Sequence, residues 1–252
     1  MNNEVYTEEY KGLTINIMYE DQPQNPFEDW DCEPPLAVYS DRNITEYATG
    51  YGEVNSVPTL TRSQIIANKA EILSMLDAPS FFHAVDRNDL ASYSIEDIIN
   101  DRISEYVDDL GNSDRLDALC DLYNMAGMPA VCSTVRGCCQ GDWAKVLAVA
   151  TPEFREACGN GEAFDWIESL KGSIQLFEDW AFGNVYGYEV LDAEGEHVDS
   201  CWGYFGDYDA DYGALSEAKS AADHHIEWAK KSHFEQVKTW IKNRVPLAYR
   251  VA

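Results

Sequence analysis

The stretch from Gly183 to Gly213 constrains the fold most, because it has the pattern of a β-hairpin. Two runs rich in β-forming residues, 185–191 and 196–202, flank the short turn 192–195, which begins with Asp and ends with Gly. Such runs on either side of an Asp/Gly turn predict two antiparallel strands. We expect this hairpin to anchor an antiparallel sheet.

Further strands are predicted before and after the helical segments. Residues 13–19 alternate apolar and polar side chains, which indicates a strand with one buried face. Residues 36–39 follow as the second strand of a wide hairpin with it. Residues 128–135 and 143–150 are two more strands joined by a glycine-containing turn. We expect residues 40–58 to be a loop, because they carry Gly50, Gly52 and Pro58 and no clear period.

Capping residues and helical periods mark the helices. Thr61 with Gln64, and Ser94 with Asp97, have the spacing of capping boxes. Other helices are expected over 113–125, from Pro152 to near Gly159, over 164–181 and over 215–244. The expected inward faces are Ile65, Ile66, Ile72, Leu73 and Leu76; then Ile95, Ile98, Ile99, Ile103, Tyr106 and Leu110; and, in the last helix, Leu215, Ala218, Ala222, Ile226, Ala229, Val237 and Ile241.

Taken in order, these elements predict an α+β fold. Hairpins dominate over strand–helix–strand crossovers, which favours an antiparallel sheet with several packed helices and a long C-terminal helix. We expect a single domain over residues 1–252, with a possible helical insert at 61–126. A hydrophobic content of 45% is ample for a packed core.

The charge is strongly acidic, with 45 Asp and Glu against 18 Lys and Arg, for a net charge of −27. Direct binding of nucleic acid is disfavoured, because contacts to phosphates rely on basic side chains. A basic protein surface, or cations, are the partners that the charge favours. The alternative is an acidic protein adapted to a salty or crowded setting.

The acidic residues concentrate in two places. Two helices between 94 and 125 carry nine acids against Arg102 and Arg115: Glu96, Asp97, Asp101, Glu105, Asp108, Asp109, Asp114, Asp117 and Asp121. Positions 97, 101, 105 and 109 are neighbours at i, i+4, so their carboxylates should stack along one side. The hairpin and its exit loop add Asp199, Asp207, Asp209 and Asp211. Ordinary solvated faces usually mix both signs, so we interpret these acids as a partner-binding face.

The exit loop also resembles a calcium loop. Asp207, Asp209 and Asp211 alternate as metal ligands do in an EF-hand, but the required Gly and Glu are each one position off. Because the three carboxylates alternate as ligands do, Ca²⁺ binding by these three residues is one prediction. Acids that favour a helix N-terminus are the account we prefer.

No decisive catalytic pattern is present. His224, His225 and His233 lie on the last helix without a metalloprotease motif, and Ser and Cys residues lack a nucleophile context. An enzyme stays possible, because active-site residues need not be close in sequence. The seven cysteines have irregular spacing, which indicates reduced, mostly buried thiols in a cytosolic protein. The N-terminus has no signal-peptide pattern, and no apolar run is long enough to span a membrane.

The C-terminal part has the opposite charge. Residues 213–252 carry seven bases and four acids. A homodimer, with this basic segment against the acidic body of a second copy, is one interpretation. The simpler one, which we prefer, is that cations are favoured near a helix C-terminus.

Three segments resemble a family of uncharacterised proteins encoded by bacteriophages: 25–31 before the 36–39 strand, Gln140–Trp143, and 183–188 continuing to 199–206 with its sequence Asp-Ser-Cys-Trp-Gly-Tyr-Phe-Gly. The resemblance covers about a quarter of the chain and implies no known reaction. It implies phage origin and action in the host cytoplasm. Phages commonly carry small acidic proteins that occupy DNA-binding grooves of host defence nucleases.

From charge and resemblance together we expect a non-enzymatic inhibitor of a host defence system, such as a CRISPR effector or a restriction enzyme. It would act by DNA mimicry or by covering a nucleic-acid-binding surface of a basic host protein. The alternatives are a divalent-cation-binding accessory protein or enzyme, and a homo-oligomeric structural protein of the phage.

Overall fold

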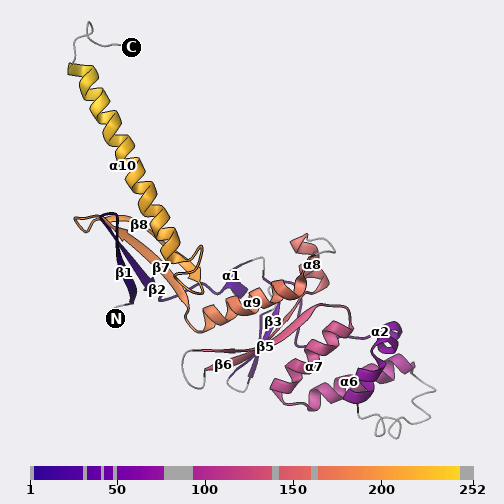
Figure 1. Ribbon diagram of the computed structural model, residues 1–252. Helices are drawn as coiled ribbons and strands as arrows, with labels where there is room; N and C mark the ends of the chain where they lie inside the picture. The colour runs from indigo at the N-terminus through magenta and orange to yellow at the C-terminus, as the bar shows by residue number, and fades with distance from the viewer. Residues whose placement is uncertain are drawn as a thin grey trace. The chain divides into compact units, whose positions relative to one another are not determined.

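The predicted hairpin is the edge of a four-stranded antiparallel sheet. The computed structural model describes residues 3–30, 33–40, 43–47, 50–76, 93–137, 142–159 and 164–244. Strands β1 (Glu4–Tyr10), β2 (Leu13–Tyr19), β7 (Val185–Leu191) and β8 (His197–Phe205) pair in the order β1-β2-β7-β8 (Figure 1). The strand predicted at 13–19 is confirmed as β2, and the predicted hairpin is confirmed as β7 and β8. Strand β1 was not predicted.

This sheet and the last helix form one of two compact units, made of residues 1–24 and 183–252. Residues 25–182 form the other unit, which includes the whole of 61–126. The expectation of a single domain with an insert at 61–126 stays a prediction. An α+β class with antiparallel strands and a long C-terminal helix is confirmed, with two sheets in place of one.

One face of the first sheet is covered by α10 (Ala214–Arg244). The alternation predicted for β2 places Leu13, Ile15 and Ile17 in a core with Tyr188 and Val190 of β7. The helix presents its small residues to this core, because Ala214, Ala218 and Ala222 allow a close approach to the strands.

Tight turns fix the register of these strands. Lys11 and Gly12 both have positive φ, 53° and 87°, as a two-residue turn between twisted antiparallel strands requires. In the second hairpin the carboxylate of Asp192 accepts hydrogen bonds from the backbone N–H groups of Glu194 (3.0 Å) and Glu196 (2.8 Å). The Asp/Gly turn predicted from the sequence is therefore held by its own side chain.

A close contact between Gly187 and Trp202 joins β7 to β8. The register of the two strands shifts between Tyr186 and Tyr188, next to this glycine. A Cβ atom on Gly187 would lie only 2.7 Å from Cζ3 of Trp202 and closer still to two other indole atoms. The indole ring of Trp202 therefore occupies the space that a side chain at Gly187 would need.

The second unit contains a second antiparallel sheet, in the order β4-β3-β6-β5. Its strands are β3 (Leu36–Ser40), β4 (Asn43–Tyr47), β5 (Ala130–Arg136) and β6 (Trp143–Val149). The prediction that β3 pairs with β2 is wrong, since β3 pairs with β4 and β6. The loop predicted over 40–58 is wrong where it includes β4. This short edge strand has no fully buried residue, so its hydrophobic period is weak.

Helices cover both faces of this sheet. On one face lie α1 (Pro26–Asp29), α8 (Pro152–Cys158) and α9 (Trp166–Ala181); on the other lie α2 (Arg62–Ala67), α3 (Lys69–Met75), α6 (Ile95–Asp109) and α7 (Asn112–Met125). Strand β6 serves both cores, since Val146 and Ala148 face α9 whereas Leu147 and Val149 face α7. A strand buried on both faces reads as a continuous apolar run, and residues 146–150 are such a run.

Two of the predicted helix faces need correction. The helix begun by the Thr61–Gln64 capping box breaks at Asn68, whose side chain donates a hydrogen bond to the carbonyl of Gln64 (2.9 Å). Ile65 and Ile72 pack in one core on either side of this break, whereas Ile66 is exposed. Helix α6 has the predicted capping box, but Ile95 in its first turn is exposed too.

Candidate functional site

Helix α6 presents acidic side chains to solvent because its opposite side is fixed in the core. Ile103 and Val107 are fully buried among residues of the core that α6 shares with α7. The residues of the predicted row are all exposed: Asp97, Asp101, Glu105 and Asp109. Residues four positions apart in a helix rise about 6 Å along the axis, which sets the spacing of this row.

Basic side chains neutralise part of this acidity. Four carboxylates on the two helices lie in ion pairs, namely Glu96 with Arg62, Glu105 with Arg102, Asp108 with Arg115 and Asp117 with Lys145. Asp97 also has a structural role, since its carboxylate accepts a hydrogen bond from the N–H of Ser94 (3.2 Å). Within the described ranges, five of the nine acids form no ion pair and carry the uncompensated charge: Asp97, Asp101, Asp109, Asp114 and Asp121.

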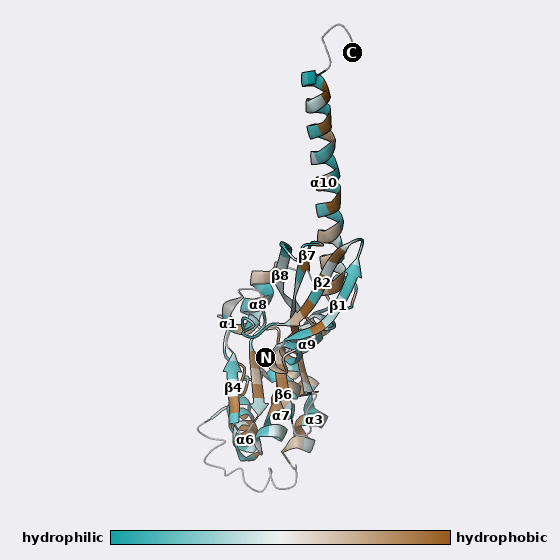
Figure 2. Ribbon diagram, turned by 90° about the vertical axis from the view of Figure 1, so that its left-hand side faces the viewer, coloured by the Kyte–Doolittle hydropathy of each residue, from teal (hydrophilic) through white to brown (hydrophobic). Residues whose placement is uncertain are grey.

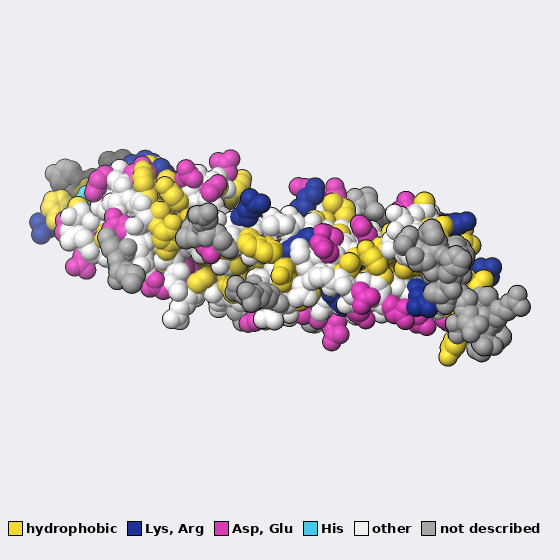
Figure 3. Space-filling model, turned by 90° about the horizontal axis from the view of Figure 1, so that it is seen from below, with side chains coloured by type: hydrophobic (Ala, Val, Ile, Leu, Met, Phe, Trp, Pro, Cys, Tyr) yellow, Lys and Arg dark blue, Asp and Glu magenta, His cyan; other side chains and the backbone are white. Residues whose placement is uncertain are grey.

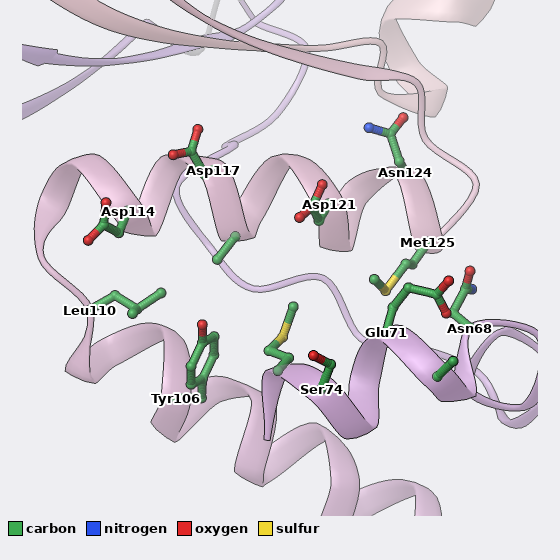
Figure 4. Close-up of a pocket in the computed structure, with 13 residues that line it drawn as sticks. Asn68, Glu71, Ser74, Tyr106, Leu110, Asp114, Asp117, Asp121, Asn124 and Met125 are labelled. Carbon is green, nitrogen blue, oxygen red and sulfur yellow. The ribbon is translucent and has the colours of Figure 1, made fainter. Parts of the chain in front are cut away.

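A groove lies between α3, α6 and α7, with a volume of about 1030 Å³. Helix α6 contributes Tyr106, which points toward α7 in Figure 4, and Leu110, which extends into the space between the two helices. Buried Ala118 and half-buried apolar side chains form its floor, and exposed acids of α3 and α7 form its rim. The floor is Met75, Tyr106, Leu110, Ala118 and Met125, and the rim includes Glu71, Asp114, Asp117 and Asp121.

The acids of α6 and those of α7 therefore serve different surfaces. No carboxylate of α6 lines the groove, whereas all three predicted acids of α7 do. Asp121 is affected by this position: partial burial, and then the neighbouring charge of Asp117, raise its pKa. Asp117 turns toward Lys145 on β6, away from the floor (Figure 4). A cation entering the groove would relieve the repulsion between Asp117 and Asp121.

The remaining predicted acids belong to the other unit. Asp199 on β8 accepts a hydrogen bond from the hydroxyl of Tyr188 (3.4 Å), and burial together with Asp199 raises the pKa of Tyr188 to about 12. Asp207, Asp209 and Asp211 are exposed in the loop before α10. On the face drawn in Figure 3, carboxylates lie singly or in small groups between apolar and uncharged side chains.

The loop predicted to bind calcium is closed by its own backbone. The carbonyls of Asp207, Tyr208 and Ala210 accept hydrogen bonds from the N–H groups of Ala210, Leu215 and Gly213. Over the described ranges, no group of three or more His, Cys, Asp or Glu side chains is placed to hold a metal ion. The Ca²⁺ site at Asp207, Asp209 and Asp211 stays a prediction from the sequence.

The described thiols are less buried than the sequence indicated. Cys120, Cys132 and Cys158 are half-buried and Cys201 is exposed, whereas Cys32, Cys138 and Cys139 lie outside the described residues, as do Gln140 and Gly141. Burial raises the pKa of the Cys120 thiol to about 11 and that of Cys132 further still. These thiols are therefore poor nucleophiles near neutral pH.

Sequence reasoning found the acids but missed the groove. Its floor combines Met75 of α3, Tyr106 and Leu110 of α6, and Met125 of α7. The helical period predicts that Tyr106 and Leu110 belong to an inward stripe. Both are half-buried, and no local pattern distinguishes a groove floor from a core.

Comparisons with known proteins add no family. No protein-family model, no curated protein and no solved structure matches the chain. Across the part of the chain that the structure describes, no helix combines the length and apolar character needed to cross a bilayer.

Proposed function

We propose that this protein is a non-enzymatic inhibitor that covers the basic, nucleic-acid-binding surface of a host defence protein, such as a CRISPR effector or a restriction enzyme. The observation that carries the proposal is the solvent side of α6, where exposed carboxylates recur at successive turns. The net charge of −27 adds a long-range attraction toward a basic target. The resemblance to phage-encoded proteins supports the choice of a defence system as target.

The spacing of the carboxylates favours occlusion over full mimicry of a duplex. DNA carries about one charge per 1.7 Å of helix axis, whereas acids four apart on α6 stand about 6 Å apart. Asp108 and Asp109 increase the density only at the C-terminal end of the helix. A single helix therefore supplies enough charge to engage a few Lys and Arg side chains of the target. To fill a whole DNA-binding channel, the protein would need further rows of carboxylates beside the one on α6.

The test is binding to purified defence complexes over a range of salt concentrations, after co-purification from infected host cells has named the target. We expect the affinity to fall steeply as salt rises, since charge pairs at an exposed interface are screened. Replacing Asp101 and Asp109 by Lys should weaken binding and flatten the salt dependence. Both residues are exposed and lie outside the core and the groove.

A matched control separates this surface from net charge alone. Changing Glu194 and Glu196 to Lys alters the total charge by the same amount, but both residues lie in the other unit. The control should bind nearly as the unaltered protein does. Equal losses in both variants, or an affinity indifferent to salt, would refute the proposal.

A further inference from the structure

The distal half of α10 has an apolar stripe without a partner in the described structure. The buried residues of this helix, Ala214, Ala218 and Ala222, are all in its first turns. Farther along, five large apolar side chains are exposed, of which Trp228 comes first. The other four lie close together in the sequence: Phe234 65%, Val237 40%, Trp240 55% and Ile241 46%. The prediction that Ala229, Val237 and Ile241 face inwards is therefore wrong, because the helix continues past the sheet of its own unit (Figure 1).

These side chains fall on one side of the helix. Phe234, Val237 and Ile241 are spaced by three and four residues, and Trp240 lies beside them. Figure 2 shows hydrophobic segments alternating with hydrophilic ones along this part of α10. A stripe of this kind, on a helix that leaves the core, is the feature by which amphipathic helices recognise a partner groove.

The same half of the helix is basic. Between Glu227 and Arg244 there are five bases against two acids, which are Lys230, Lys231, Lys238, Lys242 and Arg244 against Glu227 and Glu235. Lys230 and Lys238 lie one turn before and one turn after Phe234, so positive charge borders the stripe. The partner that this helix fits is an apolar groove with an acidic rim.

The groove of the second unit has that chemistry. Its floor of Met75, Leu110 and Met125 offers flexible apolar side chains, which adapt well to a helix. Exposed acids, among them Asp114 and Asp121, border the floor. Neither of these two acids has an ion-pair partner within the described ranges. An incoming Lys would also lower the electrostatic cost that Asp117 imposes on Asp121.

We propose that the distal half of α10 from one copy of this protein binds in the α3–α6–α7 groove of a second copy. Val237 and Ile241 would contact the apolar floor, and the bases beside the stripe would pair with Asp114 and Asp121. The proposal does not use the acidic row of α6. It therefore stands apart from the inhibitor function proposed above.

Local charge favours this pairing over contact between two α10 helices. Two α10 helices side by side would bring together two segments that are each positively charged. The net charge of −27 opposes the approach of α10 to an anionic membrane and to a second copy alike, so the local match at the contact decides between them. The groove of a second copy supplies apolar surface and opposite charge together.

The experiment is sedimentation velocity of the full chain over a dilution series at low salt. We expect a concentration-dependent dimer. Changing Val237 and Ile241 to Asp (the helix variant) should weaken association by about tenfold or more, because charges would enter the apolar contact. Changing Asp114 and Asp121 to Lys (the groove variant) should do the same through repulsion of the basic helix.

Mixing the two variants gives the decisive result. The groove variant keeps an intact helix and the helix variant keeps an intact groove, so a mixture should form more dimer, of one copy of each, than either variant forms alone at the same concentration. The control is Trp228→Asp. Trp228 is exposed and lies nine residues from Val237, which places it on the opposite side of α10. This control should dimerise like the unaltered protein.

Several results would overturn the proposal. Monomers at every concentration would do so, and so would a groove variant that still dimerises, which would indicate pairing between α10 helices. Binding of the unaltered chain to phosphatidylserine vesicles, lost in the helix variant while dimerisation is kept, would assign the stripe to a membrane. Far-ultraviolet circular dichroism and urea unfolding of each variant verify that a lost dimer does not reflect lost folding.

Discussion

Replacement of Gly187 by Ala tests the contact that joins β7 to β8. The added methyl group would overlap the indole of Trp202, because 2.7 Å to Cζ3 is well inside van der Waals contact. Overpacking of a well-packed site costs about 1–3 kcal/mol. Loss of backbone freedom in the unfolded chain offsets about 0.4–1 kcal/mol of that, since Gly187 is not among the described residues with positive φ. We expect a net loss of about 1–2 kcal/mol.

The freedom of the Trp202 side chain limits how much Gly187→Ala can lower the free energy of unfolding. Its exposed fraction is 46%, so the ring can swing outward at the expense of its contact with the strand. The assay is urea unfolding followed by circular dichroism, together with amide hydrogen exchange of β7 and β8. Exchange is needed because a chain of two units can unfold in more than one step. Faster exchange should be confined to the unit that contains these strands.

A double-mutant cycle decides whether the indole is the cause. In a Trp202→Ala background the overlap disappears, so Gly187→Ala should become neutral or slightly stabilising. The coupling between the two substitutions should then equal about the whole cost of the clash. An equal destabilisation by Gly187→Ala in both backgrounds would refute the reasoning and place the strain in the backbone.

Three further predictions concern the helices and thiols. Ser94→Ala removes the N-cap of α6 and should lower the free energy of unfolding by about 1 kcal/mol in urea titrations, and Ser94→Asp should restore it. Asp121→Asn should raise stability by at most about 0.5 kcal/mol near neutral pH, because solvent screens this exposed residue. The pKa of Asp121 is raised in the folded state, so ionisation of this carboxyl lowers the free energy of unfolding as pH rises. In acid the carboxyl is protonated, and the stability gained by Asp121→Asn should vanish. A gain that persists in acid would contradict the raised pKa. Iodoacetamide followed by peptide mass spectrometry should label Cys201 well before Cys132, whose thiol pKa is raised by burial, and the reverse order would show that the strand pairing around Cys132 opens.

Local signals predicted most elements of the fold because they are written in neighbouring residues. Each of these signals forms its hydrogen bonds with residues only a few positions away. They are the Asp192–Gly195 turn, the capping boxes at Thr61 and Ser94, and the helix that starts at Pro152 and ends at Gly159. Their structural outcome depends little on the rest of the chain. This is why the hairpin and the helix starts were predictable.

Strand partners and the groove needed contacts far apart in sequence. Strand β3 pairs with β6, more than one hundred residues later, and nothing within 36–40 selects that partner over β2. The floor of the groove gathers Met75, Leu110 and Met125 from three helices. A helical period shows which residues avoid water, but it does not show whether a neighbour will cover them completely.

The sequence alone determined the α+β class, the acidic charge and the long C-terminal helix, since these follow from local propensity and composition. Tertiary structure decided which carboxylates are already neutralised, as Asp108 is by Arg115, and which line the groove. It also decided that the apolar stripe of α10 continues beyond its own sheet. The physical reason is that burial and ion pairing depend on which surfaces meet in space, and the sequence lists residues without their neighbours.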